Sequence, residues 1–137
     1  GAAGPLYGSA FRHMGRTLGD TETFDSEDLL SALRAGLEEI QRLGAATVGD
    51  KTMVDAYSPA LDAFARGLRS GQAAEEAGAR ARAAAEEGMR STIPMQARKG
   101  RASYLGARSI GHQDPGATST AILFAALEQA LDDRGGE

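Results

Sequence analysis

The 137-residue chain contains no cysteine and no tryptophan, and aromatic residues make up only 5% of it. The lack of cysteine excludes disulfide bonds and thiolate metal sites, and it fits a cytoplasmic protein. The scarcity of aromatic side chains, alongside 18 glycines and many alanines, favours closely packed helices over a β-sheet, which would need more Val, Ile, Tyr and Phe.

Long apolar runs and an excess of positive charge are also missing. No stretch approaches the roughly 18 apolar residues that a membrane-spanning helix needs. The formal net charge is −4, so the chain as a whole has no electrostatic affinity for nucleic acid or an anionic membrane. Basic residues are not interleaved with aromatic ones, which also disfavours nucleic-acid binding. The length suits one domain with a modest core.

The first clear helix is predicted to follow a cap at Asp25 or Ser26 and to end at Gly44, where a glycine in the C′ position would close it. One face is apolar at intervals of four, four and three residues, as an amphipathic helix requires. This face consists of Leu29, Leu33, Leu37 and Ile40.

A second helix is predicted over residues 51–68, capped by Asp50 and kinked or interrupted near Pro59. The third runs from Gln72 to about Ser91 and consists almost entirely of Ala, Glu and Arg, which are strong helix formers. Small residues on its inner face would let a neighbouring helix approach closely. We expect this face to contain Ala73, Ala77, Ala81, Ala84 and Met89.

The last helix is predicted to open at residues 117–119, with Thr118 or Ser119 as its cap. Its buried side is expected to contain Ile122, Leu123, Leu127 and Leu131. No segment has a convincing strand period of two, so the chain is predicted to be an all-α bundle.

Residues 88–120 form the most informative segment, because it is long and lacks a helical or strand period. Structureless runs of about 20 residues are uncommon inside compact domains and are usually functional. Arg98, Lys99 and Arg101 cluster here, upstream of the turn residues 114–116. Guanidinium groups match phosphate oxygens, so this cluster in an acidic chain favours a small anionic ligand. The alternative is a solvated loop whose charges pair with surface glutamates.

Other candidate positions have a structural interpretation as well as a functional one. Asp114, Pro115 and Gly116 are typical turn residues, although the helix start behind them could also place N–H groups beside a ligand. Met53 is either a core residue or a flat partner for a purine ring. The glycine-rich segment 1–8 lacks the GK[ST] of a Walker A loop. The carboxylates are scattered along the sequence and indicate no metal-binding cluster.

Four blocks of sequence, in order, resemble the L subunit, or L domain, of dihydroxyacetone kinases. They are GAAGPLYG at residues 1–8, GDKTMVDA at 49–56, STIPMQARKGRASYLG at 91–106 and RSIGHQDPGATS at 108–119. The resemblance implies an up-and-down barrel of eight antiparallel helices, with a nucleotide in a deep pocket at one end. Residues 1–137 would correspond to about the last two-thirds of that domain, without its first helices.

The resemblance also implies roles for individual residues. Ala2 and Ala3 would lie along the nucleotide, and many family members have Ser at the position of Ala3. The family binds two Mg²⁺ ions through three aspartates in a loop before the glycine-rich block, and this sequence contains no such cluster. Gly44 and Met53 would border the adenine, and Arg101 would contact the phosphates. The pocket would be closed by Asp114, Pro115 and Gly116.

In the family, this subunit presents a nucleotide phosphoryl group to dihydroxyacetone held by a histidine of a separate K subunit, so the chain itself needs no nucleophile. We predict the cytoplasmic type in which ADP is a bound cofactor recharged by the M subunit of the phosphotransferase system. One alternative is a fused ATP-dependent kinase for dihydroxyacetone or an erythrulose-type ketose. Another, of a different class, is a non-catalytic helical interaction module. Without the aspartate loop, the 137-residue chain alone is predicted to be inactive.

Overall fold

The computed structural model describes residues 25–135, and within this range every regular element is helical. Four α-helices are connected by turns and by one longer excursion that contains a 3₁₀ segment. The elements are α2 (Ser26–Gly44), α3 (Val54–Arg69), α4 (Ala74–Ser91), η1 (Arg101–Ser109) and α5 (Pro115–Gly135). The all-α prediction is confirmed for this part of the chain. None of its helices is both long and apolar enough to cross a membrane.

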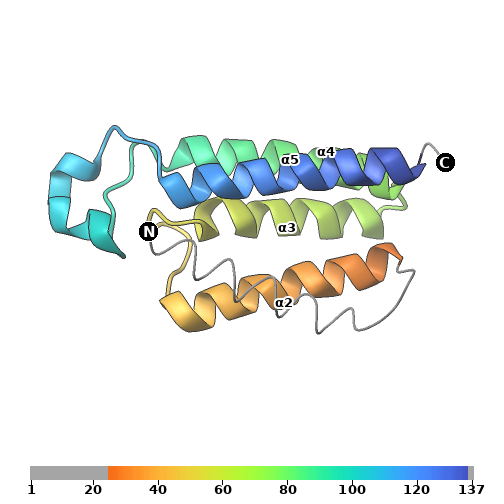
Figure 1. Cartoon of the computed structure of the whole chain (residues 1–137), viewed down its shortest axis with the longest axis horizontal. Coiled ribbons are helices and arrows are strands. Elements are labelled where there is room, and N and C mark those ends of the chain that lie inside the picture. Colours follow the sequence, from red (N-terminus) through yellow and green to blue (C-terminus); the bar gives the residue numbers. More distant parts are fainter. Residues whose placement is uncertain (1–24, 136–137) are drawn as a thin grey trace.

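Successive α-helices run antiparallel, as Figure 1 shows, and α3 occupies the centre of the arrangement. Helix α3 packs against α2, α4 and α5, and α4 also packs against α5. The segment between α4 and α5, which contains η1, projects beyond the end of the bundle where α2 and α4 end and α3 and α5 begin (Figure 1). One end of the bundle is therefore built from loops and helix termini.

Helix α2 begins with the cap that the sequence predicts. The carboxylate of Asp25 accepts a hydrogen bond from the N–H of Asp28 (2.9 Å), and the carboxylate of Asp28 accepts one from the N–H of Asp25 (3.1 Å). The predicted apolar face is buried. At the other end, Gly44 is still helical and Ala45 takes the left-handed conformation (φ 50°), so the predicted glycine stop is wrong by one residue.

Helix α4 packs against α3 through a row of alanines and glycines, which allows a close approach. The buried alanines recur every four residues, so the inner face contains Ala85 rather than the predicted Ala84, which is half-buried, while Ala73 is exposed. At the C-terminal end of this face, a Cβ on residue 88 would overlap the carbonyl oxygen of Asp55. The inner face consists of Ala77, Gly78, Ala81, Ala85 and Gly88.

Pro59 lies inside the continuous helix α3 instead of interrupting it. A proline has no N–H, so the carbonyl of Asp55, four residues earlier, lacks its usual intrahelical donor. Gly88 of α4 approaches that same carbonyl. The absence of a Cβ on Gly88 lets α3 and α4 come this close at this end.

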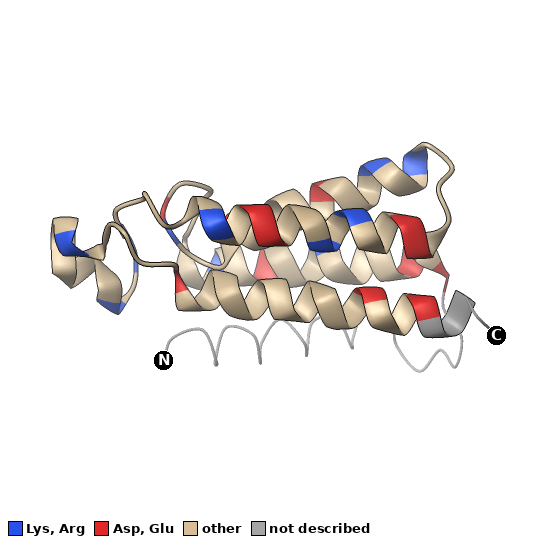
Figure 2. Cartoon of the chain, turned by 90° about the horizontal axis from the view of Figure 1, so that it is seen from above, with Lys and Arg blue, Asp and Glu red and all other residues tan. Residues whose placement is uncertain are grey.

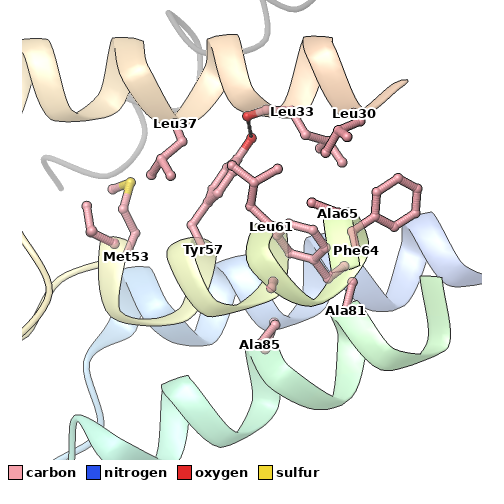
Figure 3. Close-up of a cluster of buried hydrophobic side chains, with 14 of the residues drawn as sticks. Leu30, Leu33, Leu37, Met53, Tyr57, Leu61, Phe64, Ala65, Ala81 and Ala85 are labelled. Atoms are coloured by element: carbon pink, nitrogen blue, oxygen red, sulfur yellow. Dashed lines mark hydrogen bonds between the residues drawn. The ribbon is translucent and has the colours of Figure 1, made fainter. Parts of the chain in front are cut away.

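Tyr57 and Phe124 form the centre of the core. Both are fully buried, and their rings meet edge to face with centroids 5.4 Å apart and an interplanar angle of 89°. Figure 3 shows Tyr57 reaching from α3 toward α2, where its hydroxyl donates a hydrogen bond to the carbonyl of Leu33 (2.8 Å). Burial raises the pKa of Tyr57 well above its usual range.

Helix α5 begins earlier than predicted, and its buried side agrees with the prediction at Leu131, which is 7% exposed, but not at Ile122. Pro115 is its first residue, and the carboxylate of Asp114 accepts the N–H of Ala117 (2.9 Å), so Asp114 is the cap rather than Thr118 or Ser119. Ile122 is 66% exposed, contrary to the predicted burial, and Phe124 is fully buried instead. Apolar residues of α5 lie on several of its faces, so their spacing does not identify the side that packs against the bundle.

Candidate functional site

A pocket of about 400 Å³ opens at the loop-bearing end of the bundle, where α2 ends and α3 and α5 begin. This volume lies within the usual range for small-molecule sites. Four segments contribute to its walls: residues 40–46 and 51–54, which are neighbours in sequence, and the distant residues 99–102 and 114–116. Its lining residues are Ile40, Gly44, Ala46, Lys51, Thr52, Met53, Val54, Lys99, Gly100, Arg101, Ala102, Asp114, Pro115 and Gly116.

Most of the residues that the resemblance implies for nucleotide binding lie in this one pocket. Ala2 and Ala3 lie outside the described residues. Of the remaining positions, Met53 is 4% exposed, whereas Arg101 is exposed at the edge. All six predicted residues that the structure describes line the pocket: Gly44, Met53, Arg101, Asp114, Pro115 and Gly116.

The two sides of the pocket differ in chemistry. The end of α2 and the start of α3 contribute apolar side chains, including Ile40, Ala46 and Val54. The projecting loop contributes the cations Lys99 and Arg101, and the start of α5 adds the positive end of a helix dipole. An elongated ligand with a flat apolar part and an anionic part fits this division.

The turn before α3 is held by a buried carboxylate. Asp55, 2% exposed, accepts hydrogen bonds from the N–H groups of Gly49 (2.6 Å) and Thr52 (2.9 Å). The prediction that Asp50 caps α3 is wrong, because its carboxylate instead accepts the N–H of Thr47 (3.0 Å) within the preceding turn. Asp55 therefore fixes the backbone from which Met53 enters the pocket.

The projecting loop, residues 92–114, is closed at its base by polar contacts. The N–H of Gly111 donates to the carbonyl of Ile93 (2.7 Å), and the N–H of Ala97 donates to the hydroxyl of Ser109 (2.9 Å). Between these contacts, residues 101–109 form η1, with a break at Gly106 (φ 58°). The loop is thus more ordered than its sequence, which has no period, predicts.

Asp114 joins the loop to α5 and to the end of α4. Its N–H donates to the hydroxyl of Thr92 (3.0 Å), which in turn donates to the carbonyl of Met89 (2.6 Å). Burial raises the pKa of the Asp114 carboxyl above its ordinary value, and Asp55 acts in the same direction, while the N–H of Ala117 and the nearby charge of Lys51 lower it. The carboxylate in the pocket wall is thus held by its capping role.

Positive charge is concentrated on the projecting loop. Residues 93–113 contain four Lys or Arg residues and no Asp or Glu, and η1, in the projecting part of Figure 2, is coloured blue without red. The side chains of Arg98, Lys99, Arg101 and Arg108 are exposed. Among the described residues, no salt bridge pairs these four with a carboxylate.

The family model of the DAK2 domain matches residues 1–129. The chain belongs to the DAK2 domain family. A relative from Listeria innocua, named PEP-dependent dihydroxyacetone kinase 1, ADP-binding subunit DhaL, is 43% identical over 94% of this chain and 59% of its own length. The PTS-dependent dihydroxyacetone kinase, ADP-binding subunit DhaL, of Lactococcus lactis is 46% identical over 96% of this chain and 60% of its own length.

A third relative differs in its named substrate. The L-erythrulose 1-kinase of Mycolicibacterium smegmatis is 42% identical over 96% of this chain and 23% of its own length. These relatives confirm the resemblance to L subunits and L domains of dihydroxyacetone kinases. The chain spans about 60% of the length of the two ADP-binding subunits.

One charged pocket residue of this DAK2 domain, Lys51, was not predicted from the sequence. Lys51 lines the pocket, yet it is only 4% exposed and has a positive φ of 63°. A lysine between two turn-forming residues and an apolar helix reads as a solvated surface residue, because lysine is rarely buried without partners. Its partners are backbone carbonyls from far along the chain, which no local pattern reveals.

A metal site is not found in the described part of the DAK2 domain. Residues 25–135 contain no group of three or more His, Cys, Asp or Glu side chains that could hold a metal ion. Asp114 and Asp55 lie near each other, but their oxygens accept backbone N–H groups. These residues do not form the oxygen-rich set that Mg²⁺ requires.

Proposed function

We propose that this chain is the larger part of the ADP-binding L subunit of a dihydroxyacetone kinase, and that the pocket at the loop-bearing end of the bundle holds the nucleotide. The observation that carries the proposal is the convergence of six residues from four segments on one pocket. The relatives named as ADP-binding subunits support the choice of ADP.

The chemistry of the pocket supports one orientation of the nucleotide. Adenine would lie against the apolar side, between Gly44 and the thioether of Met53. The phosphates would lie toward Arg101 and the N-terminus of α5 at Gly116, where a guanidinium fork and a helix dipole both favour anions. The ribose would bridge the two sides.

The chain itself would bind and orient the nucleotide. Phosphoryl transfer depends chiefly on positioning and on neutralising charge over the transferred oxygens, so Arg101 needs only to hold the phosphates in place. Dihydroxyacetone would be held by a separate K subunit, and the M subunit of the phosphotransferase system would recharge ADP. The names of the relatives, which specify PEP or PTS dependence, support this type over an ATP-dependent one.

Mg²⁺ is proposed to accompany the nucleotide, but the described residues do not supply its ligands. Residues 25–135 therefore contribute to phosphoryl transfer through the nucleotide and not through metal ligands of their own. The ketose is proposed to be dihydroxyacetone, with an erythrulose-type ketose as the second candidate because one relative is named L-erythrulose 1-kinase.

Calorimetric titration of ADP tests the proposal, with and without Mg²⁺, on the wild-type chain and on Arg101→Ala. Loss of a charge-assisted contact to phosphate costs about 1.5–3 kcal/mol, so the variant should bind ADP about 10- to 100-fold more weakly. Arg101 is exposed and outside the core, so the melting temperature should not change.

Adenosine is the matched ligand control, because it lacks the phosphates that Arg101 would contact. Its affinity should be the same for wild type and variant. A wild-type chain that binds neither ADP nor ATP would contradict the proposal and favour a non-catalytic helical module. Equal ADP affinity in wild type and variant would remove Arg101 from the site.

A further inference from the structure

Lys51 is the buried basic residue in the wall of the pocket, and its ammonium group lies between the two limbs of the projecting loop. The Nζ donates to the carbonyl of Met95 (3.0 Å) on the outgoing limb and to the carbonyl of Ser109 (2.6 Å) on the returning limb. These acceptors are 44 and 58 residues away in sequence. One side chain thus joins three segments.

The backbone around Lys51 is prepared for this role. Its φ of 63° lies in the left-handed region, which lysine seldom adopts, and residues held in such conformations cluster at ligand sites. Asp55 fixes the turn on both sides of Lys51 through the N–H groups of Gly49 and Thr52. The neighbouring carbonyl of Asp50 accepts the N–H of Arg98 (3.1 Å), which adds a second link from the same turn to the loop.

The loop depends on such contacts because apolar burial contributes little to it. Of the residues between Arg98 and Ile110, only Ser109 is buried, and large apolar side chains there are exposed: Tyr104 by 88% and Leu105 by 45%. A charged donor makes stronger hydrogen bonds to carbonyls than a neutral one. The ammonium of Lys51 is therefore a principal link between the bundle and the base of the loop.

We propose that Lys51 is a positioning residue for phosphate binding: it anchors both limbs of the loop and so holds Arg101 over the pocket. The identity of the ligand in this inference rests on the proposed function. The anchoring of the loop rests only on the hydrogen bonds of Lys51. Lys51 acts through Arg101, so its removal should matter only when Arg101 is present and only for ligands with phosphates.

A double-mutant cycle tests this assignment. Lys51→Met keeps the length of the side chain and removes the ammonium, and it should weaken ADP binding about 10-fold while leaving adenosine affinity unchanged. In an Arg101→Ala background the same change should weaken ADP binding less than about 2-fold, because coupled residues are not additive. The proposal would be overturned if the losses of ADP binding free energy in the two single variants were additive. It would also be overturned if the wild type bound ADP and Lys51→Met bound it equally well.

Limited trypsin digestion tests the anchoring without any nucleotide. Cleavage of Lys51→Met should accelerate after Arg98, Lys99, Arg101 and Arg108, but not after the helical sites Arg66, Arg80 and Arg90. Uniform acceleration at all sites would indicate a general loss of stability and overturn the positioning role. If wild type does not bind ADP while loop cleavage still accelerates, the proposed function fails and the anchoring stands.

Arg82→Met is the matched control for charge. It also removes one positive charge, from an ion pair with Glu86 and Glu128 on α4 and α5 that lies outside the pocket. Its ADP affinity and its loop cleavage should match wild type. Effects equal to those of Lys51→Met would show that net charge, rather than the anchor, is responsible, and would overturn the proposal.

Discussion

Phe124 and Tyr104 are aromatic residues at opposite extremes of solvent exposure. Phe124 has no exposed surface and meets Tyr57 edge to face, whereas Tyr104, on the projecting loop, is 88% exposed. The bundle is stabilised by apolar packing of small and aromatic side chains. The loop is held by hydrogen bonds to backbone groups: the ammonium of Lys51 donates to two carbonyls, and the hydroxyl of Ser109 accepts the N–H of Ala97. The packing that stabilises the bundle thus differs in kind from the polar contacts that hold the loop.

Truncating the two aromatic residues gives the largest contrast. Phe124→Ala should lower the free energy of unfolding by about 3–5 kcal/mol, because it removes a buried ring and leaves a cavity. Tyr104→Ala should change it by less than about 0.5 kcal/mol. Urea denaturation followed by circular dichroism measures both values. A similar loss in the two variants would show that the loop is part of the cooperative core.

A pair of glycine substitutions in α4 sharpens the account of the bundle. Gly88→Ala should cost about 1–3 kcal/mol, because its Cβ would overlap the carbonyl oxygen of Asp55 and lie 2.9 Å from the Cα of Ala56, and neither backbone atom can move freely.

Gly78→Ala is the matched control in the same helix. There the Cβ would lie 2.8 Å from Cδ1 of Leu131, the end of a flexible side chain, and the gain in helix propensity of about 1 kcal/mol offsets the shift. Thermal unfolding should therefore show a lower melting temperature for Gly88→Ala and little change for Gly78→Ala. The opposite order would contradict the close approach of α3 and α4.

The regular parts of the fold could be predicted from sequence because they depend on local patterns. The apolar stripe of α2 and its capping residue Asp25 follow from spacing and residue type alone. The start of α5 is also encoded locally, since Asp114 followed by Pro115 is a cap followed by a proline in the first helical position. The same residues are typical of a turn, so the sequence does not decide between the two. Burial of Phe124 rather than Ile122 was not predictable, because the face of α5 is decided by packing against α3 and α4.

The site was accessible from sequence only in part. The resemblance identified pocket residues in four segments, and the structure brings together those that it describes. It did not identify Lys51, whose carbonyl partners Met95 and Ser109 come close only when the loop folds back on the bundle. The residue pattern around this turn did not distinguish Asp50 from Asp55 as the carboxylate that fixes it, since both are suitable acceptors.

The most direct test of the account is a methyl NMR spectrum of the chain labelled at its methionines, recorded during an ADP titration with Mg²⁺. Met53 lines the pocket, whereas Met89 packs against the core on α4. The account predicts that ADP shifts the methyl resonance of Met53 and leaves that of Met89 in place. A resonance of Met53 that does not move at saturating ADP would contradict the central claim that this pocket holds the nucleotide.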